Sequence, residues 1–129
     1  MAARGRPDHP QALQGHDCIG FEGAFSGREW PFLIAGERRS VSVAPRLIVN
    51  TAEAAVDAAM AGSGITRVLS YQAAEAVRLG RLETVLEPFA LPAWPVQLVH
   101  AMRGLAPQKL KLFMDFAAPR LRARLMAHR

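Results

Sequence analysis

The clearest pattern of apolar and polar positions lies between Leu47 and Leu69. It opens with the apolar run Leu47-Ile48-Val49, which is typical of a strand buried on both faces. Apolar residues then recur at helical spacing, at Ala52, Ala55, Val56, Ala59 and Met60. The chain then re-enters the sheet with another predicted strand over 65–69. The pattern predicts a right-handed strand–helix–strand crossover in an α/β fold, in which ligands bind at the carboxyl ends of the strands.

Polar residues and glycines mark the two ends of this predicted helix. Asn50 follows the first strand and supplies a side-chain oxygen that can cap the helix amides, with Glu53 at the third helical position as in a capping box. Gly62 and Gly64 are expected to end the helix, because glycine takes the left-handed cap conformation without steric cost.

Shorter patterns predict the other elements. Strands are expected over 18–21, 30–34, 40–43, 82–86 and 96–101, and helices over 10–16, 71–79 and from 107 onward. The strands at 30–34 and 40–43 form a hairpin across 35–39. Ser70 is placed to cap the helix at 71–79. Pro119 lies inside the last helix and is expected to kink or end it near Ala118.

Composition narrows the class of protein. The chain has 129 residues, half of them hydrophobic, which predicts one modest globular domain and argues against disorder. No apolar run is long enough to span a membrane, and the N-terminus lacks the apolar core of a secretory signal. The single cysteine fits a reducing environment, so we expect a cytoplasmic protein that does not enter a membrane.

The net charge of +5 raises the question of nucleic acid binding. The excess arginines collect near the two ends of the chain, and no recognition motif accompanies them. Direct contact of this chain with DNA is therefore not expected. A mildly positive field is better suited to attracting a small anionic molecule.

No pattern of reactive side chains predicts catalysis. Cys18 lies within a predicted strand and is interpreted as a small core residue. Histidines occur at positions 9, 16, 100 and 128. They lack the spacing of metal ligands, and no second cysteine accompanies them. We therefore expect no enzyme activity, no metal and no cofactor.

Short motifs follow one another along almost the whole chain. They are His9-Pro10, His16-Asp17-Cys18-Ile19, Trp30-Pro31-Phe32, Asn50-Thr51, Gly62-Ser63-Gly64-Ile65, Gly80-Arg81-Leu82 and Leu105-Ala106-Pro107. In this order they resemble the effector-sensing domain of LysR-type transcriptional regulators. The resemblance implies a Rossmann-like fold in the manner of type-2 periplasmic binding proteins, with a mixed sheet. It also implies a tail over 1–6, the second sensor subdomain over 7–93, and a strand and helix over 94–129 that belong to an incomplete first subdomain.

The resemblance further implies which partners such a chain has. Family members carry a winged helix-turn-helix ahead of this region, so DNA binding is expected only through an N-terminal domain that this sequence lacks. The strand at 96–101 and the apolar stripe of the last helix also lack their family neighbours. That stripe comprises Leu110, Phe113, Met114, Ala117 and Leu121. We expect a homo-oligomer or a full-length regulator to be the protein partner.

The candidate effector site lies where the parallel strands end. It comprises Asn50, Thr51, Ser70, Phe21 and Glu22. The amides at a helix start favour anions, and by the resemblance this edge faces the cleft that holds a small effector. Asn50 and Ser70 are equally well explained as helix caps. Both interpretations stay open, since one residue can serve both purposes.

Three hypotheses about function follow from the sequence. The first is the sensing domain of a LysR-type regulator, which binds an anionic metabolite and passes on its occupancy as a change of shape. The second is an interaction protein that pairs with itself or with a full-length regulator through its C-terminal strand and helix, whose apolar faces are uncovered. The third is a non-functional gene fragment, which predicts melting without cooperativity.

Overall fold

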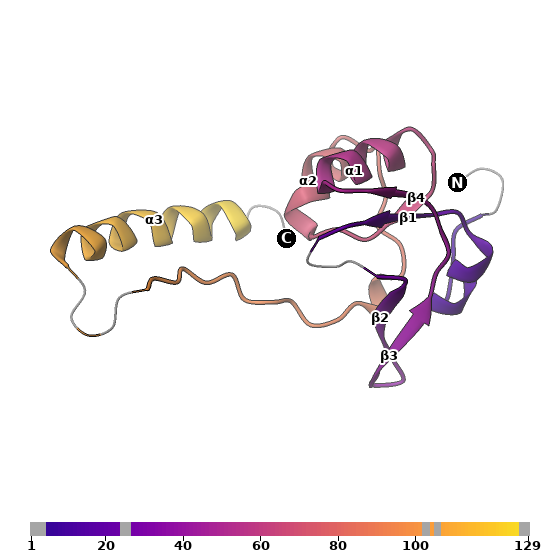
Figure 1. Ribbon diagram of the computed structural model, residues 1–129, viewed down its shortest axis with the longest axis horizontal. Coiled ribbons are helices and arrows are strands. Elements are labelled where there is room, and N and C mark those ends of the chain that lie inside the picture. Colours follow the sequence, from indigo (N-terminus) through magenta and orange to yellow (C-terminus); the bar gives the residue numbers. More distant parts are fainter. Residues whose placement is uncertain (1–4, 24–26, 102–103, 105–106, 127–129) are drawn as a thin grey trace. The chain divides into compact units, whose positions relative to one another are not determined.

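The computed structural model describes residues 5–23, 27–101, 104 and 107–126. It divides the chain into two compact units, Met1–Pro92 and Ala93–Arg129. The first contains η1 (Pro10–Gly15), β1 (Cys18–Phe21), β2 (Glu29–Ile34), β3 (Glu37–Ser42), β4 (Pro45–Val49), α1 (Ala52–Met60), β5 (Ile65–Thr66), α2 (Ser70–Arg78) and η2 (Glu87–Phe89). The second contains α3 (Gln108–Met126). Among the described residues, Figure 1 labels the three α-helices and strands β1 to β4. The α/β fold that the sequence predicts is confirmed.

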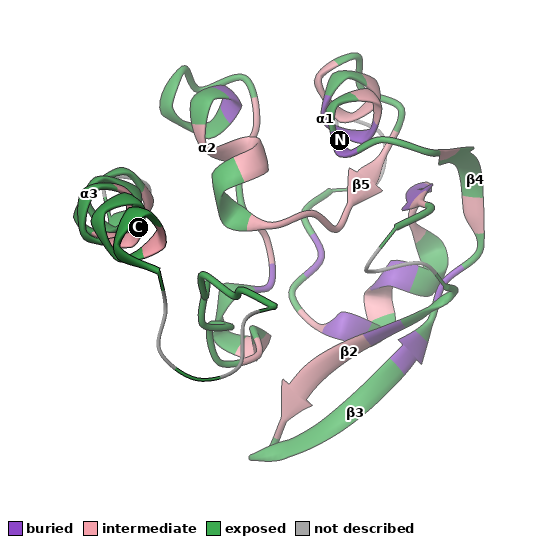
Figure 2. Cartoon of the chain, turned by 60° about the vertical axis from the view of Figure 1, so that its left-hand side comes forward, coloured by how far each residue is buried: buried purple, intermediate pink, exposed green. Residues whose placement is uncertain are grey.

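Three parallel strands in the order β4-β1-β5 form the sheet that positions the candidate site. α1 connects β4 to β5 and packs against all three strands. Its apolar stripe faces the sheet, with Ala52, Ala55 and Val56 buried (Figure 2). The predicted strand–helix–strand unit is therefore present, and the helix has its predicted face inward.

β4 is an edge strand and not the doubly buried strand that its apolar run predicts. It pairs with β1 alone among the described strands, and Leu47 and Ile48 are 39% and 53% exposed. The prediction was wrong because an apolar run shows what a strand could bury, whereas burial also needs a neighbouring strand and a covering layer. A register shift follows the pairing of Cys18 with Pro45, so the ladder is irregular where proline enters it.

Other predicted strands are shorter or absent. β5 ends at Thr66, and the described residues over 82–86 and 96–101 form no strand. Leu86 is buried with a φ of 61°, which fits a turn and not a strand. In each case an apolar run was mistaken for a strand. A strand forms only where a neighbouring chain segment takes up its backbone hydrogen bonds.

The hairpin of β2 and β3 turns at Ala35 and Gly36, which is a tighter connection than the predicted one over 35–39. η1 packs against β3, and η2 packs against β2. The buried residues of this region form one cluster, Leu13, Cys18, Trp30, Val43 and Leu86. Because Cys18 belongs to β1, the cluster joins the hairpin to the parallel sheet.

Thr51, and not Asn50, caps the amino end of α1. The Thr51 hydroxyl accepts a hydrogen bond from the Ala54 amide at 3.1 Å. Glu53 consequently stands at the second helical position, and the predicted capping box is not formed. The carboxyl end closes at Gly62 as predicted, with a φ of 81° and with the next amide also turned back onto the last helical turn.

Ser70 is the first residue of α2 and not its cap. The Leu69 amide instead donates to Oε1 of Gln72 at 2.9 Å, so a side chain from the first turn reaches back to the residue before the helix. The capping interpretation of Ser70 was therefore wrong. α2 forms because Gln72 takes the role that the sequence seemed to give to Ser70.

Pro119 does not end α3, which runs without a break from Gln108 to Met126. The Arg120 guanidinium donates to the carbonyl oxygen of Phe116 at 2.8 Å and lies 3.6 Å from the centre of the Phe116 ring. A side chain thus serves the backbone in the turn where proline removes an amide donor. The prediction that the helix could end near Ala118 was wrong, and the alternative of a kink there stays a prediction.

Cys18 is fully buried, and burial together with the nearby negative charge of Asp17 raises the pKa of its thiol. The folded thiol stays protonated at pH values where the unfolded thiol ionises, so the free energy of unfolding is expected to fall as the pH rises above the ordinary thiol pKa. Urea unfolding at about pH 7 and about pH 10 measures this fall. The free energy of unfolding of a Cys18→Ala variant should fall less between these two pH values. Rapid reaction of Cys18 with a thiol reagent in the folded protein would contradict this expectation.

Candidate functional site

The carboxyl ends of β1 and β4 meet at one edge of the parallel sheet. Phe21 pairs with Val49, and the Glu22 amide donates to the Val49 carbonyl at 2.8 Å. This hydrogen bond continues the ladder one residue past β1 and places Glu22 beside the turn into α1. Three of the predicted site residues, Phe21, Glu22 and Asn50, therefore lie around the last bond of one strand pair.

The amino end of α1 adds backbone donors to this edge. Thr51 has extended backbone angles and uses its hydroxyl for the Ala54 amide. The amides at 52 and 53 have no acceptor within the helix, as at any helix start, and together with the helix dipole they favour an anion. Asn50 is exposed immediately before this turn. Since Asn50 does not cap the helix, its amide group is available for another role.

Ser70 is not held at this edge by a strand. β5 ends at Thr66, and a three-residue connection separates it from Ser70 at the start of α2. The sequence pattern placed Ser70 at the end of β5 because it extended that strand to Leu69. The residue that follows β5 directly is Arg67, which is not among the predicted site residues.

Arg67 is the notable side chain at this edge. It follows Thr66, whose hydroxyl donates to the Ile19 carbonyl at 3.2 Å and fixes the end of β5 against β1. Arg67 is half-buried, and burial lowers the pKa of its guanidinium, with a further lowering by the positive charge of Arg38 on β3. The only sequence signal was the polar Thr66-Arg67 pair inside the stretch predicted as a strand over 65–69. The contribution of Arg38 could not be seen, because the hairpin brings it from far along the chain.

Arg38 places a second positive charge near Arg67, which further disfavours the charged form of Arg67. Neighbouring strands are about 5 Å apart, so the ends of β4 and β5 are separated by roughly the length of a small organic anion. Asn50, Glu22 and Arg67 follow β4, β1 and β5 in turn and so form a row along this edge of the sheet. The row has the start of α1 at one end and a guanidinium at the other. Glu22 stands between them and is exposed, where water screens its charge.

The described residues contain neither a candidate metal cluster nor a membrane-spanning helix. Over 5–23, 27–101, 104 and 107–126, histidine, cysteine and acidic residues form no group of three that could hold a metal ion. Among these residues there is also no helix that is long and apolar enough to cross a membrane. His9 has a structural contact, since its ring lies edge-on to Phe89 with the ring centres 4.9 Å apart.

The sequence is similar to a known domain family and to bacterial transcriptional regulators. A family model described as LysR substrate binding domain matches residues 1–122. An uncharacterized HTH-type transcriptional regulator of Escherichia coli K12, YcaN, is 31% identical over 116 residues, which is 90% of this chain and 38% of that protein. A putative transcriptional regulator of Pseudomonas aeruginosa PAO1 is 35% identical over 97 residues, or 74% of this chain and 31% of that protein. The chain thus spans about a third of the length of these relatives.

Solved structures show the same likeness at the level of the fold. The regulatory domain of AphB from Vibrio vulnificus matches with a TM-score of 0.65 at 19% identity, over 90% of this chain and 58% of that one. CrgA, a LysR-type transcriptional regulator from Neisseria meningitidis, matches with a TM-score of 0.62 at 23% identity, over 71% of this chain and 31% of that one.

Proposed function

The chain belongs to the LysR substrate binding domain family, and we propose that it binds a small anionic effector on behalf of a transcriptional regulator. Its fold is the periplasmic-binding-protein-like fold of the regulatory domains to which it is similar. The proposed site is the row at the carboxyl edge of the sheet, formed by Phe21, Glu22, Asn50, Thr51 and Arg67. Ser70 stays a proposed member on the α2 side.

The observation that carries this proposal is the placement of Arg67. A guanidinium that is half-buried beside a second positive charge suits a carboxylate or phosphate, which offsets both the lost hydration and the repulsion from Arg38. The start of α1 provides backbone donors at the opposite end of the row. An effector with one anionic group near each end meets both.

The effect on a regulator is proposed to be a shift between two arrangements of the sensor. An effector that contacts one arrangement better than another changes their populations by its difference in affinity. DNA binding would come from a part of the regulator outside the residues matched here. A regulator that acts at promoters works in the cytoplasm. Its proposed oligomeric partner is either a second copy of this chain or a complete regulator.

We propose binding and not catalysis. His9 accepts a hydrogen bond from the Gln11 amide at its Nδ1, 3.4 Å away, and caps η1. Cys18 is buried with a raised thiol pKa, which keeps it from acting as a nucleophile. Neither residue is arranged to take a proton from a ligand or to attack it. No metal or cofactor is needed for the proposed role.

An Asn50→Asp variant tests the anion site. The added negative charge beside the start of α1 should weaken the binding of small carboxylates by about fivefold or more. Thermal melting in the presence of acetate, succinate, citrate and inorganic phosphate finds the responsive anion, and calorimetry then gives its dissociation constant. Gln14→Glu is the matched control, because it places the same charge at an exposed position of η1. Equal weakening by the two variants would indicate a nonspecific charge effect and would contradict the site.

Pairing through the C-terminal segment is the second candidate function. Large apolar side chains are exposed in this unit, including Val96 (66%), Val99 (88%), Phe113 (60%) and Phe116 (58%), and no described residue of α3 is buried. Exposed apolar surface of this kind indicates a protein partner.

Sedimentation of the full chain tests this second candidate. We expect a self-associating protein whose association weakens by about tenfold in a Phe113→Glu variant, since a charge is then placed in the apolar surface. Lys111→Asp, two residues earlier on α3, is the control for a change of charge on the same helix. A monomer that melts cooperatively and responds to an anion would leave the sensor as the better account.

A further inference from the structure

A depression lies at the end of the strand–helix–strand unit opposite the proposed effector site. Its volume is about 350 Å³ and its lining consists of Asp17, Arg46, Leu47, Gly62 and Ser63. These residues precede β1, open β4 and follow α1, so the cavity lies at the amino ends of the strands. The proposed effector site lies at the carboxyl ends of the same strands. A volume of this size is in the range of pockets for small molecules.

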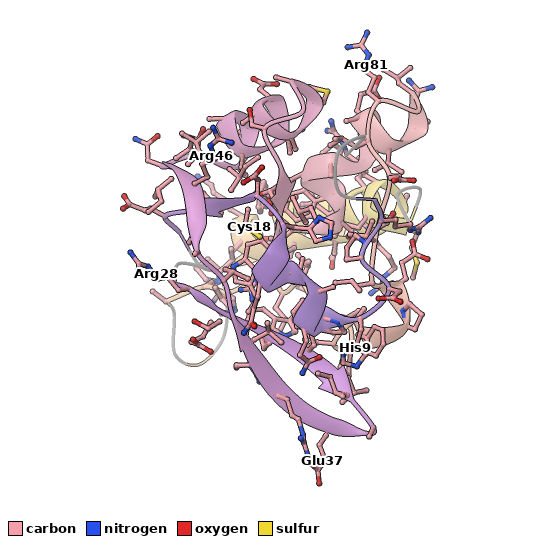
Figure 3. The ribbon with its side chains drawn as sticks, turned by 90° about the vertical axis from the view of Figure 1, so that its right-hand side faces the viewer. His9, Cys18, Arg28, Glu37, Arg46 and Arg81 are labelled. Carbon is pink, nitrogen blue, oxygen red and sulfur yellow. The ribbon has the colours of Figure 1, made fainter. Side chains whose placement is uncertain are left out.

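Two opposite charges meet at this cavity. A guanidinium nitrogen of Arg46 is 3.6 Å from a carboxylate oxygen of Asp17, and the two side chains are 76% and 37% exposed. Figure 3 shows Arg46 at the surface, close to α1. An ion pair that is this long and this well hydrated contributes little to stability. Its members can therefore accept the charged groups of a ligand at small cost to the fold.

The wall that carries Asp17 is fixed in place. The Ile65 amide donates to the Asp17 carbonyl at 2.9 Å, and Gly64 approaches the same carbonyl so closely that a side chain would not fit between them. Gly62 and Ser63 form the end of α1 beside it. The Asp17 carboxylate and the partial negative charge of the helix end both favour a positive group. Arg46 favours a negative group on the same ligand.

We propose that this cavity binds a zwitterion, namely a free α-amino acid with an apolar side chain. The ammonium group contacts Asp17 and the end of α1, and the carboxylate contacts the guanidinium fork of Arg46. The apolar side chain covers Leu47, which is 39% exposed. The two charges of an α-amino acid lie on neighbouring carbon atoms, which matches the short separation of Asp17 and Arg46. This site is additional to the proposed effector site and does not depend on it.

An NMR titration of the isotope-labelled full chain with L-leucine tests the proposal. The amide signals of residues 17, 46, 47, 62 and 63 should shift, while those of residues 21, 50 and 51 should stay in place. N-acetyl-L-leucine lacks the ammonium charge, and L-leucinamide lacks the carboxylate. Each should bind about tenfold more weakly than L-leucine, because one charged contact is lost.

Two charge variants and one control complete the test. Asp17→Asn and Arg46→Gln should each weaken L-leucine binding by about tenfold while unfolding stays cooperative. Arg78→Gln breaks another exposed ion pair, 2.8 Å from Glu75, and should leave the affinity unchanged. Equal binding of the three probes, unaltered affinity in both variants, or no shift of the cavity amides up to the solubility limit would overturn the proposal. Shifts confined to residues 21, 50 and 51 would also overturn it, while leaving the effector site standing.

Discussion

A Gly64→Ala substitution is expected to lower the free energy of unfolding by about 3 kcal/mol or more. Gly64 has a φ of 146°, which residues with a side chain rarely adopt, and an added Cβ would overlap the Asp17 carbonyl oxygen. That carbonyl accepts the Ile65 amide, the hydrogen bond with which β5 joins β1. The backbone must move apart at this point. β5 is only two residues long, so a displacement at this point affects the whole strand.

Gly62→Ala is the matched control for this prediction. Gly62 also has a positive φ, 81°, but nothing lies within 4 Å of an added Cβ. Its substitution should therefore cost only the left-handed conformation, about 1 kcal/mol. Urea unfolding followed by the fluorescence of Trp30, which is 4% exposed, measures both variants in one assay. Equal losses would show that the contact with Asp17 does not determine the cost.

The sequence predicted the parts of the fold that local patterns determine. α1 has its predicted apolar face and its predicted end at Gly62, although it begins one residue later than predicted, because the stripe and the glycine both act within a few residues. The order of motifs also indicated the family that the family model then confirmed. The predictions that failed concern strands, whose formation depends on neighbouring chain segments. β4 is exposed at an edge, and residues 82–86 and 96–101 form no strand, because pairing depends on chain segments that a local pattern cannot locate.

The candidate site was predicted to a similar extent. Phe21, Glu22, Asn50 and Thr51 lie at one edge because they end or follow strands that the sequence located correctly. Arg67 was missed because β5 was predicted three residues too long, which moved its end to Ser70. The charge of Arg38 lowers the pKa of the Arg67 guanidinium only in the folded chain, where the hairpin brings the two residues close together. The role of an arginine cannot be inferred from the sequence until its surroundings are known.

An Arg67→Gln substitution is expected to weaken binding of the responsive anion by about 10- to 100-fold, since a hydrogen-bonded charge pair with the ligand is lost. The reason is the position of Arg67 at the carboxyl edge of the sheet, directly after the Thr66 hydroxyl that anchors β5. Arg67→Lys keeps the charge but removes the planar guanidinium fork. Its affinity for the anion should therefore lie between those of the original chain and the Arg67→Gln variant. Calorimetry with the anion found in the melting screen measures all three proteins.

Stability distinguishes a binding role of Arg67 from a structural one. Burial and the charge of Arg38 both disfavour the charged form of Arg67, as the lowered pKa of its guanidinium records. Removing the charge should therefore leave the free energy of unfolding within about 1 kcal/mol of its original value, in contrast to a core substitution. Arg28→Gln, at an exposed position of the same unit, controls for the loss of one positive charge. If Arg67→Gln loses binding and stability together, Arg67 holds the fold. If binding falls while stability is kept, Arg67 serves the ligand and not the fold.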